Sequence, residues 1–575
     1  MKVKKKALII ILIIVAIISG AYLYLRFGIL KSKDFNPDLS KSKSILDLRP
    51  ALLAKLKQIV KDGSDGLYIL DVKDIEPDIT NSKIFLTGIN LSIDSNQLRI
   101  KDSLKTAPDQ TYKIFAKSIQ VDGIQISDLI GNEKIDLKNV FIIQPEIDVF
   151  TKKKSYNKLQ RQKDTLSLYE KIYKNISGFS VSKTLIKNAK INNHNLDKNV
   201  VTSYNDLTIF LDNILIDSTT KNSKDRFLFA SNANITMKNY RLATADSLYY
   251  FKCDSINVNA STKKLTALNI EFIPRISKEK FIQNSKIRKD FFNIKAKKII
   301  ISNINWWELA SNEKIIASEA DIYNCNFEDY INKGMTPKKF DLHNFPHQKL
   351  MNLSMGIFIR KINIKSMDLM YEEYNPNSGK SGKLYFKDIN GTVQNFTNLK
   401  SEIAKNNYMD FNVETKFMKS APAKINFKFN LAKYKTGDFT VDITANSMSN
   451  DLLNPIAEPL GMFNLKSGNV KELNVKMKGN NKTSSANFSL EYDDLYIVPL
   501  KKDEDSKGGL DKKKFTGFIA NLLLIKKENS AKDSDFRKYD YIIERGTYPN
   551  FFTLAWKTIL MGIIKTIGAP EKLAK

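Results

Sequence analysis

Most of the chain alternates apolar and polar residues with a period of two. This pattern is typical of β-strands that place one face on an apolar surface and the other in water. The clearest examples are Ile84/Leu86, Ile119/Val121, Ile124/Ile126, Ile135/Leu137, Ile147/Val149, Ile256/Val258, Ile299/Ile301, Ile362/Ile364, Leu384/Phe386, Phe411/Val413, Ile425/Phe427/Phe429, Phe439/Val441/Ile443 and Leu473/Val475/Met477. Short stretches rich in Asn, Gly, Asp and Lys separate them, as turns do in a meandering sheet. The pattern predicts a mainly β fold.

Three segments instead have the spacing of amphipathic helices. The first begins at Pro50, ends near Gly63 and places its apolar residues on one face, namely Leu52, Leu53, Leu56, Ile59 and Val60. The second is a candidate helix from about Tyr156 to Ile176. In the third, Asn550 can cap a helix from Phe551 to Ile567. The sequence therefore predicts a few helices beside many strands.

The C-terminal helix has a narrow polar stripe and a wide apolar face, which consists of Phe552, Trp556, Ile559, Ile563 and Ile567. Its 17 residues and two lysines make it a poor membrane-spanning segment. We expect this helix to close the open end of the apolar sheet. The alternative is a helix that lies in a membrane interface, with Phe552, Trp556 and Lys557 at the boundary.

An internal repeat supports the predicted sheet. At an offset of 180 residues and without gaps, residues 114–150 match residues 294–330 at eleven of 37 positions. The tetrapeptide NEKI at 132–135 recurs at 312–315. A match that keeps its register through the whole window indicates a duplicated supersecondary unit. Repeated sheet units bury their apolar faces against their neighbours, so we expect an elongated, curled sheet that forms a groove.

The N-terminus has the features of a membrane anchor. Ala7 to Leu25 contains no charged residue over 19 positions, and a helix of that length is about 28 Å long, close to the hydrocarbon thickness of a bilayer. Four lysines precede it, which favours a cytoplasmic N-terminus. A cleaved signal peptide is the alternative, but the apolar run is long and lacks a clean cleavage site. We expect a single-pass protein of a bacterial inner membrane with its body in the periplasm.

Composition removes several classes of protein. Of the 575 residues, 42% are hydrophobic and 27% are charged, which excludes a collagen, a wholly disordered chain and a polytopic membrane protein. The net charge is +29, yet only eleven of the 91 basic residues are arginine. Lysines spread along the whole chain argue against nucleic acid as a partner and favour anionic lipid head groups.

The sequence contains no arrangement that points to catalysis. It has no phosphate-binding loop, dinucleotide fingerprint or nucleophile elbow. His343 and His347 have the spacing of a zinc-binding helix, but Pro346 lies between them, so we interpret both as loop residues. Cys253 and Cys325 fall in predicted strands and are interpreted as buried thiols, with one disulfide as the alternative. We predict a protein that is not an enzyme and has no cofactor and no metal site.

Three segments resemble the AsmA-like family of bacterial inner-membrane proteins. They are VDGIQISDLIGNEKIDLKNVFIIQPEIDVF at 121–150, YEEYNPNSGKSGKLYFKDINGTVQNFTNL at 371–399 and DLLNPIAEPLGMFNLKSGNVKELNVKMKG at 451–479. The last is the most telling, with LNP at 453–455 and SGNVKEL at 467–473. The resemblance implies an N-terminal anchor and a periplasmic groove of repeated β-sheet lined with apolar side chains. It also implies a role in moving phospholipid between the two membranes, with no catalytic residues to carry over.

The predicted organisation has four regions. Residues 1–30 form a cytoplasmic stub and the transmembrane anchor, and residues 31–290 form a first β-rich region with short helices. Residues 291–500 form a second β-rich repeat region that includes the AsmA-like C-terminal part. Residues 501–575 hold a charged loop, a last strand and the C-terminal amphipathic helix.

These patterns, together with the resemblance, predict a lipid-binding or lipid-transfer protein, in which phospholipid or another acyl-chain lipid diffuses passively along the groove. The resemblance implies that this function maintains the outer membrane. The side chains expected to line the groove are Ile84, Leu86, Ile119, Val121, Ile299, Ile301, Ile362, Ile364, Phe427 and Phe429. Other expected partners are the inner membrane, through Ala7 to Leu25, and the outer membrane or its proteins. The alternative is a structural or assembly factor that holds outer-membrane proteins by β-augmentation.

Overall fold

The computed structural model of this chain describes residues 49–78, 80–123, 134–157, 178–197, 199–220, 223, 226–227, 229–244, 246–285, 287–312, 314–337, 342–502, 510–512, 525–546 and 550–569. Within these ranges no helix is long and apolar enough to cross a membrane. The predicted anchor, the pair Ile124/Ile126 and most of the second predicted helix lie outside the described residues.

The protein is mainly β, as predicted, and its strands form a large repeating sheet of mixed type. The chain divides into two compact units. The first comprises residues 1–242, 253–266 and 310–312, and the second comprises residues 243–252, 267–309 and 313–575. The division cuts through β8 (Tyr249–Asn259) and β9 (Lys264–Pro274).

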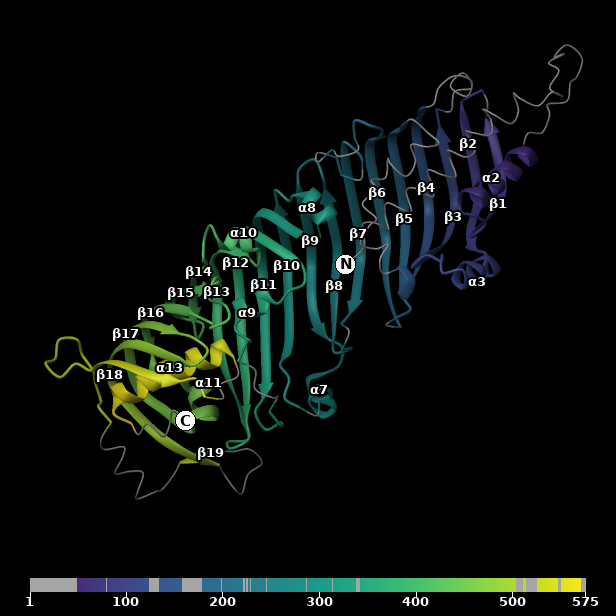
Figure 1. Ribbon diagram of the computed structural model, residues 1–575. Coiled ribbons are helices and arrows are strands. Elements are labelled where there is room, and N and C mark those ends of the chain that lie inside the picture. The colour runs from purple at the N-terminus through teal and green to yellow at the C-terminus, as the bar shows by residue number, and fades with distance from the viewer. Residues whose placement is uncertain are drawn as a thin grey trace, which may run out of the picture. The chain divides into compact units, whose positions relative to one another are not determined.

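In the first unit the strands pair in chain order from β1 to β7 (Figure 1). Neighbours are antiparallel except β4 and β5, which are parallel. The strands are β1 (Tyr68–Asp78), β2 (Lys83–Ile93), β3 (Gln110–Asp122), β4 (Lys134–Thr151), β5 (Gly178–Asn195), β6 (Val200–Ile216) and β7 (Asn232–Ala243). Helix α2 (Arg49–Gly63) packs on β1, α3 (Ser95–Ser103) connects β2 to β3, and the 3-10 turn η2 (Ser155–Asn157) follows β4.

In the second unit β9 pairs with β10, the strands from β10 to β18 pair in chain order, and β20 pairs with β18. Here β11 and β12 are parallel. The strands are β10 (Phe291–Ser302), β11 (Lys314–Asn332), β12 (Gly356–Asn375), β13 (Lys380–Thr397), β14 (Tyr408–Phe417), β15 (Ala421–Asn430), β16 (Phe439–Ser449), β17 (Phe463–Gly479), β18 (Thr483–Lys502), β19 (Leu510–Lys512) and β20 (Lys538–Glu544). The helical elements are α7 (Lys278–Asn284), α8 (Trp306–Ser311), α9 (Pro346–Met351), α10 (Lys400–Ile403), η3 (Asn450–Leu453), α11 (Asn454–Ile456), η4 (Ala457–Gly461) and α13 (Phe551–Ile567).

The internal repeat is confirmed at the level of individual residue pairs. Ile114 on β3 faces Ile147 on β4, and Ile294 on β10 faces Phe327 on β11, at the predicted offset of 180 residues. In both copies the next strand runs parallel to its neighbour. Because register and strand direction coincide, both units contain the same supersecondary structure.

A residue with a left-handed backbone lies at the equivalent point of both copies. Gln144 in β4 has a φ of 48° and Asn324 in β11 a φ of 49°, in the left-handed region. The neighbouring strand β3 keeps its register with β4 across this point, while its buried apolar residues change spacing from two to three between Ala116 and Ile119. The apolar side chains before and after this point therefore stay on one face of the sheet.

Two predicted helices lie at the expected residues. Helix α2 packs on β1 and buries Leu56, which is 1% exposed. Helix α13 begins after Asn550, whose side-chain oxygen accepts a hydrogen bond from the Thr553 amide at 2.9 Å. Gly568 ends it with a φ of 77°, as is usual at helix C-termini.

The interpretation of His347 as a loop residue is wrong. His347 lies in α9, is fully buried and stacks on Phe429 with ring centroids 5.1 Å apart. Pro346 occupies the first turn of that helix, where a missing N–H is tolerated. Burial lowers the pKa of His347 to about 4, so its ring is neutral at pH 7.

The two cysteines are free thiols, so the alternative of a disulfide between them is wrong. Cys253 is buried, and its thiol contacts the carbonyl oxygen of Ser255 at 3.1 Å. Burial raises the pKa of Cys325, which keeps its thiol protonated at neutral pH.

Candidate functional site

The predicted groove residues share one face of the sheet in each unit. In the first unit, cross-strand pairs join residues of seven strands into one row: Ile75, Leu86, Ile119, Ile142, Ile186, Ile209 and Ile235. Ile84 and Val121 face each other in the neighbouring row. The alternation in the sequence thus corresponds to continuous apolar rows that run across the strands.

The second unit has two longer rows, which we call its apolar face. The first row is Ile301, Ala320, Ile362, Val393, Phe411, Phe427, Val441, Met477, Ala486 and Tyr541. The second row is Ile299, Ile322, Ile364, Gly391, Val413, Ile425, Ile443, Val475, Phe488 and Tyr539. Phe429 lies on this face two residues after Phe427.

The two units differ in how accessible these rows are. In the first unit the four candidate residues are at most 6% exposed and belong to one core cluster: Ile84, Leu86, Ile119 and Val121. In the second unit Phe429 is 3% exposed. The other candidates there are half-buried: Ile299, Ile301, Ile362, Ile364 and Phe427. The candidates that a bound molecule can reach therefore belong to the second unit.

Helix α13 covers one part of the apolar face (Figure 1). Phe551 is 1% exposed, and its ring lies 5.0 to 6.0 Å from four phenylalanine rings outside the helix: Phe345, Phe427, Phe429 and Phe439. Farther along the helix, the hydroxyl of Tyr541 on β20 donates to the Thr558 carbonyl at 2.6 Å. The expectation that this helix closes the apolar sheet is confirmed for β15, β16, β18 and β20, which it contacts.

The side of α13 that packs on the sheet coincides only in part with its wide apolar face, since Ile559, Ile563 and Ile567 belong to both. The buried residues are Phe551, Leu554, Ala555, Thr558, Gly562, Ile564, Thr566 and Ile567. The hydroxyls of Thr558 and Thr566 each donate at 2.8 Å to the helix carbonyl four residues earlier, which satisfies them in the buried position. Small side chains on this side let the helix approach β18 closely. A Cβ on Gly562 would lie 2.4 Å from the Phe488 ring.

The three membrane-interface candidates on α13 therefore occupy different environments. Phe552 is 64% exposed, and Trp556 is half-buried. Lys557 is half-buried as well, and burial lowers its pKa. The charges that act on Lys557 are those of Glu373 on β12 and of Lys333, so this lysine lies near the sheet.

A carboxyl group interrupts the apolar side chains near one end of β11. Asp329 faces Phe292 on β10 and Tyr371 on β12. The adjacent row on the same face is apolar and consists of Ile294, Phe327, Leu369, Phe386 and Phe417. Asp329 was not among the residues predicted from the sequence. It could have been found as the one charged residue in the alternation Phe327, Asp329, Ile331.

The environment of Asp329 disfavours its charge. Its Oδ1 atom is buried and has no hydrogen-bond partner among the described residues. Burial, and secondly the negative charge of Asp290, raise the pKa of Asp329 to about 7. Burial likewise raises the pKa of the neighbouring Tyr371 well above its ordinary value, and the charge of Glu373 adds to that effect.

Charges of both signs lie next to this carboxyl group. The Tyr371 hydroxyl donates to Glu373 Oε2 at 2.5 Å, and Lys333 Nζ lies 3.5 Å from the same oxygen. Lys557 of α13 completes the group. Among the described residues, no set of His, Cys, Asp and Glu side chains is arranged to hold a metal ion. The arrangement suits a ligand that carries both a positive and a negative charge.

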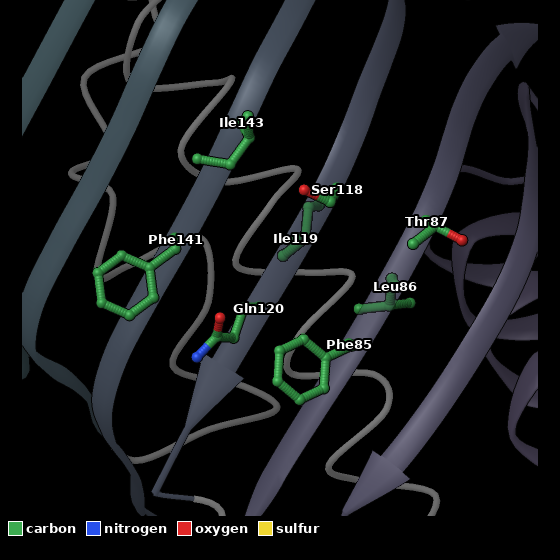
Figure 2. A pocket seen from close by; sticks show the side chains of 8 residues that line it. All are labelled: Phe85, Leu86, Thr87, Ser118, Ile119, Gln120, Phe141 and Ile143. Carbon is green, nitrogen blue, oxygen red and sulfur yellow. The ribbon is translucent and has the colours of Figure 1, made fainter.

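The first unit has a cavity of about 360 Å³ at strands β2, β3 and β4. It is lined by Phe85, Leu86, Thr87, Ser118, Ile119, Gln120, Phe141 and Ile143. Figure 2 shows the rings of Phe85 and Phe141 on either side of Gln120, which faces both of them across the strands. At the position equivalent to Phe141 the second unit has Asp321, whose carboxylate lies 2.8 Å from Lys365 Nζ. The cavity thus lies where the first copy has an aromatic residue and the second a charged one.

Comparison with known proteins finds no family model that matches this chain and no curated protein that is similar to it. The resemblance to the AsmA-like family rests on the three sequence segments given above.

Proposed function

We propose that this chain is a membrane-anchored, periplasmic lipid-binding protein of AsmA type. In this proposal it holds phospholipid on the apolar face of the second unit, and lipid moves along that face by passive diffusion. Ala7 to Leu25 would anchor it in the inner membrane. The function would serve the maintenance of the outer membrane.

The half-buried apolar residues of β10 and β12 carry the proposal. Helix α13 packs on β15, β16, β18 and β20, whereas Ile299, Ile301, Ile362 and Ile364 remain partly exposed on the same face. A contiguous apolar patch on a protein usually marks a site for an apolar partner. Each methylene group of an acyl chain that leaves water for such a surface favours binding by about 0.8 kcal/mol.

The amount of lipid that co-purifies with the full-length chain is a direct test of the proposal. The phospholipid content of the wild type would be compared with that of Ile299→Asp and Ile300→Asp by mass spectrometry of an organic extract. Residue 299 lies on the apolar face, and residue 300 is its neighbour on the opposite face of the same strand. Both variants keep the predicted anchor, so lipid bound to that segment contributes equally to each.

The proposal expects several-fold less phospholipid per chain in Ile299→Asp and an unchanged amount in Ile300→Asp. Equal amounts in all three proteins would contradict it. Crosslinks from this face to outer-membrane polypeptides would instead support the role as an assembly factor.

A further inference from the structure

Asp329 places a carboxyl group at a position of the second unit where the first unit has a buried apolar residue. The residue 180 positions earlier is Val149, which is 0% exposed. Val149 faces Tyr112 on β3, just as Asp329 faces Phe292 on β10. The fold therefore accepts an apolar side chain here, and the second unit has a charged one in its place.

One oxygen of this carboxyl group is uncompensated within the described part of the chain. Its buried Oδ1 atom has no hydrogen-bond partner among the described residues, although buried polar atoms in native proteins are nearly always paired. Among the described residues, the charge that acts on it is that of Asp290, which has the same sign. What is missing at this point is a positively charged group that can donate hydrogen bonds.

The surroundings of Asp329 set two further requirements for a molecule that binds there. On the side towards the middle of the strands lies the apolar row that contains Ile294, Phe327 and Leu369. Near Glu373, which the Tyr371 hydroxyl contacts, are Lys333 and Lys557. A molecule that fits all three features has an acyl chain, a cationic group and an anionic group.

We propose that Asp329 binds the primary ammonium group of an ethanolamine phospholipid, whose acyl chains lie on the apolar face and whose phosphate is near Lys333 and Lys557. This inference rests on the proposed function and gives it a head-group preference. A choline head group has the same charge, but its quaternary nitrogen has no N–H to donate, so it leaves Asp329 unsatisfied. Phosphatidylglycerol has no positive charge to offer.

Photocrosslinking of the full-length chain in vesicles tests the preference directly. The vesicles would contain equal parts of phosphatidylethanolamine, phosphatidylcholine and phosphatidylglycerol, and a benzophenone amino acid would replace Leu369 on the apolar row. Mass spectrometry of the adducts gives the head group of the lipid on this face. The backgrounds compared are the native residue, Asp329→Asn, Asp329→Glu and Asp321→Asn, the last altered on the same strand but on the opposite face.

We expect the ethanolamine lipid to exceed the choline lipid in the adducts by about tenfold, as one charge-assisted hydrogen bond can provide. The excess should persist in Asp321→Asn and Asp329→Glu. It should disappear in Asp329→Asn, with the total amount of lipid adduct unchanged. The same excess in Asp329→Asn would overturn the inference and leave the proposed function standing. A complete absence of lipid adducts in the native background would overturn both.

Discussion

Replacement of Asp329 by asparagine should stabilise the second unit in a way that depends on pH. The pKa of Asp329 rises from 3.8 to about 7 on folding, because burial and secondly the Asp290 charge disfavour the ionised form. Below pH 4 the carboxyl group is protonated in both the folded and the unfolded states. Between pH 4 and pH 7 the unfolded state loses the proton and the folded state keeps it, so the free energy of unfolding falls as the pH rises. Above pH 7 both states have lost the proton, and the free energy of unfolding falls no further on account of Asp329.

The pKa difference sets the size of this effect. A shift of about three pKa units corresponds to an upper bound of about 4 kcal/mol, at roughly 1.4 kcal/mol per unit. Asp329→Asn has no carboxyl group to ionise. We therefore expect the variant to exceed the wild type in free energy of unfolding by about 1 to 4 kcal/mol at pH 8 and by nearly nothing at pH 4.

Urea unfolding followed by tryptophan fluorescence is the suitable assay, since the three tryptophans all belong to the second unit: Trp306, Trp307 and Trp556. Asp321→Asn serves as the control. Burial opposes ionisation of Asp321, but hydrogen bonds from Lys365 and Asn363 lower its pKa overall, so its contribution is lost as the pH falls. Equal unfolding of wild type and Asp329→Asn at pH 4 and pH 8 would refute the account of an uncompensated carboxyl group.

Three further substitutions test how the fold is held. Phe551→Ala removes the ring at the centre of four others and should cost about 3 to 5 kcal/mol in urea unfolding, whereas Phe552→Ala, at a 64% exposed position, should cost little. Gly562→Ala places a Cβ 2.4 Å from the Phe488 ring and should lower the stability by about 1 to 3 kcal/mol, measured by the same fluorescence assay. Asn324→Val puts a β-branched residue at a φ of 49° and should lower the melting temperature, whereas Asn324→Gly should not. Wild-type stability of Phe551→Ala or Gly562→Ala would contradict the packing described for that residue. Wild-type stability of Asn324→Val would contradict the left-handed backbone at that position.

The mainly β fold was predictable from the sequence because alternation is a local property of the chain. A side chain that points to one face of a strand is two residues from the next on that face, whatever the partner strand is. The repeat was predictable for a similar reason, since Ile114 and Ile294 keep their register with β4 and β11 without any gap. The left-handed residues Gln144 and Asn324 were not predicted, because the sequence shows them only as a change in the spacing of apolar residues from two to three.

The environment of α13 could not be read from its helical pattern alone. The pattern gives the wide apolar face that contains Phe552 and Trp556, and it predicts that this face packs on the sheet. The structure instead buries Thr558 and Gly562, because small residues allow the closest approach to Phe488 and the threonine hydroxyls bond within the helix. Which side of a helix packs depends on the shape of the partner surface, which is formed by strands far away in the sequence.

The group of side chains around Asp329 could not be predicted from the sequence for the same reason. Its members come from β11, β12, the segment after β11 and α13, and they meet only once the sheet is paired. His347 illustrates a different limit. A proline one residue before a histidine suggests a loop, yet the same proline is favourable at the start of α9.

The central claim is that the apolar face of the second unit holds lipid, and crosslinking at Ile364 in living bacterial cells tests it most directly. A benzophenone amino acid at this half-buried position should give adducts with the mass of a phospholipid, and the same residue in place of Ile300 on the opposite face should give none. Adducts only with polypeptide, or equal lipid labelling at both positions, would contradict the claim.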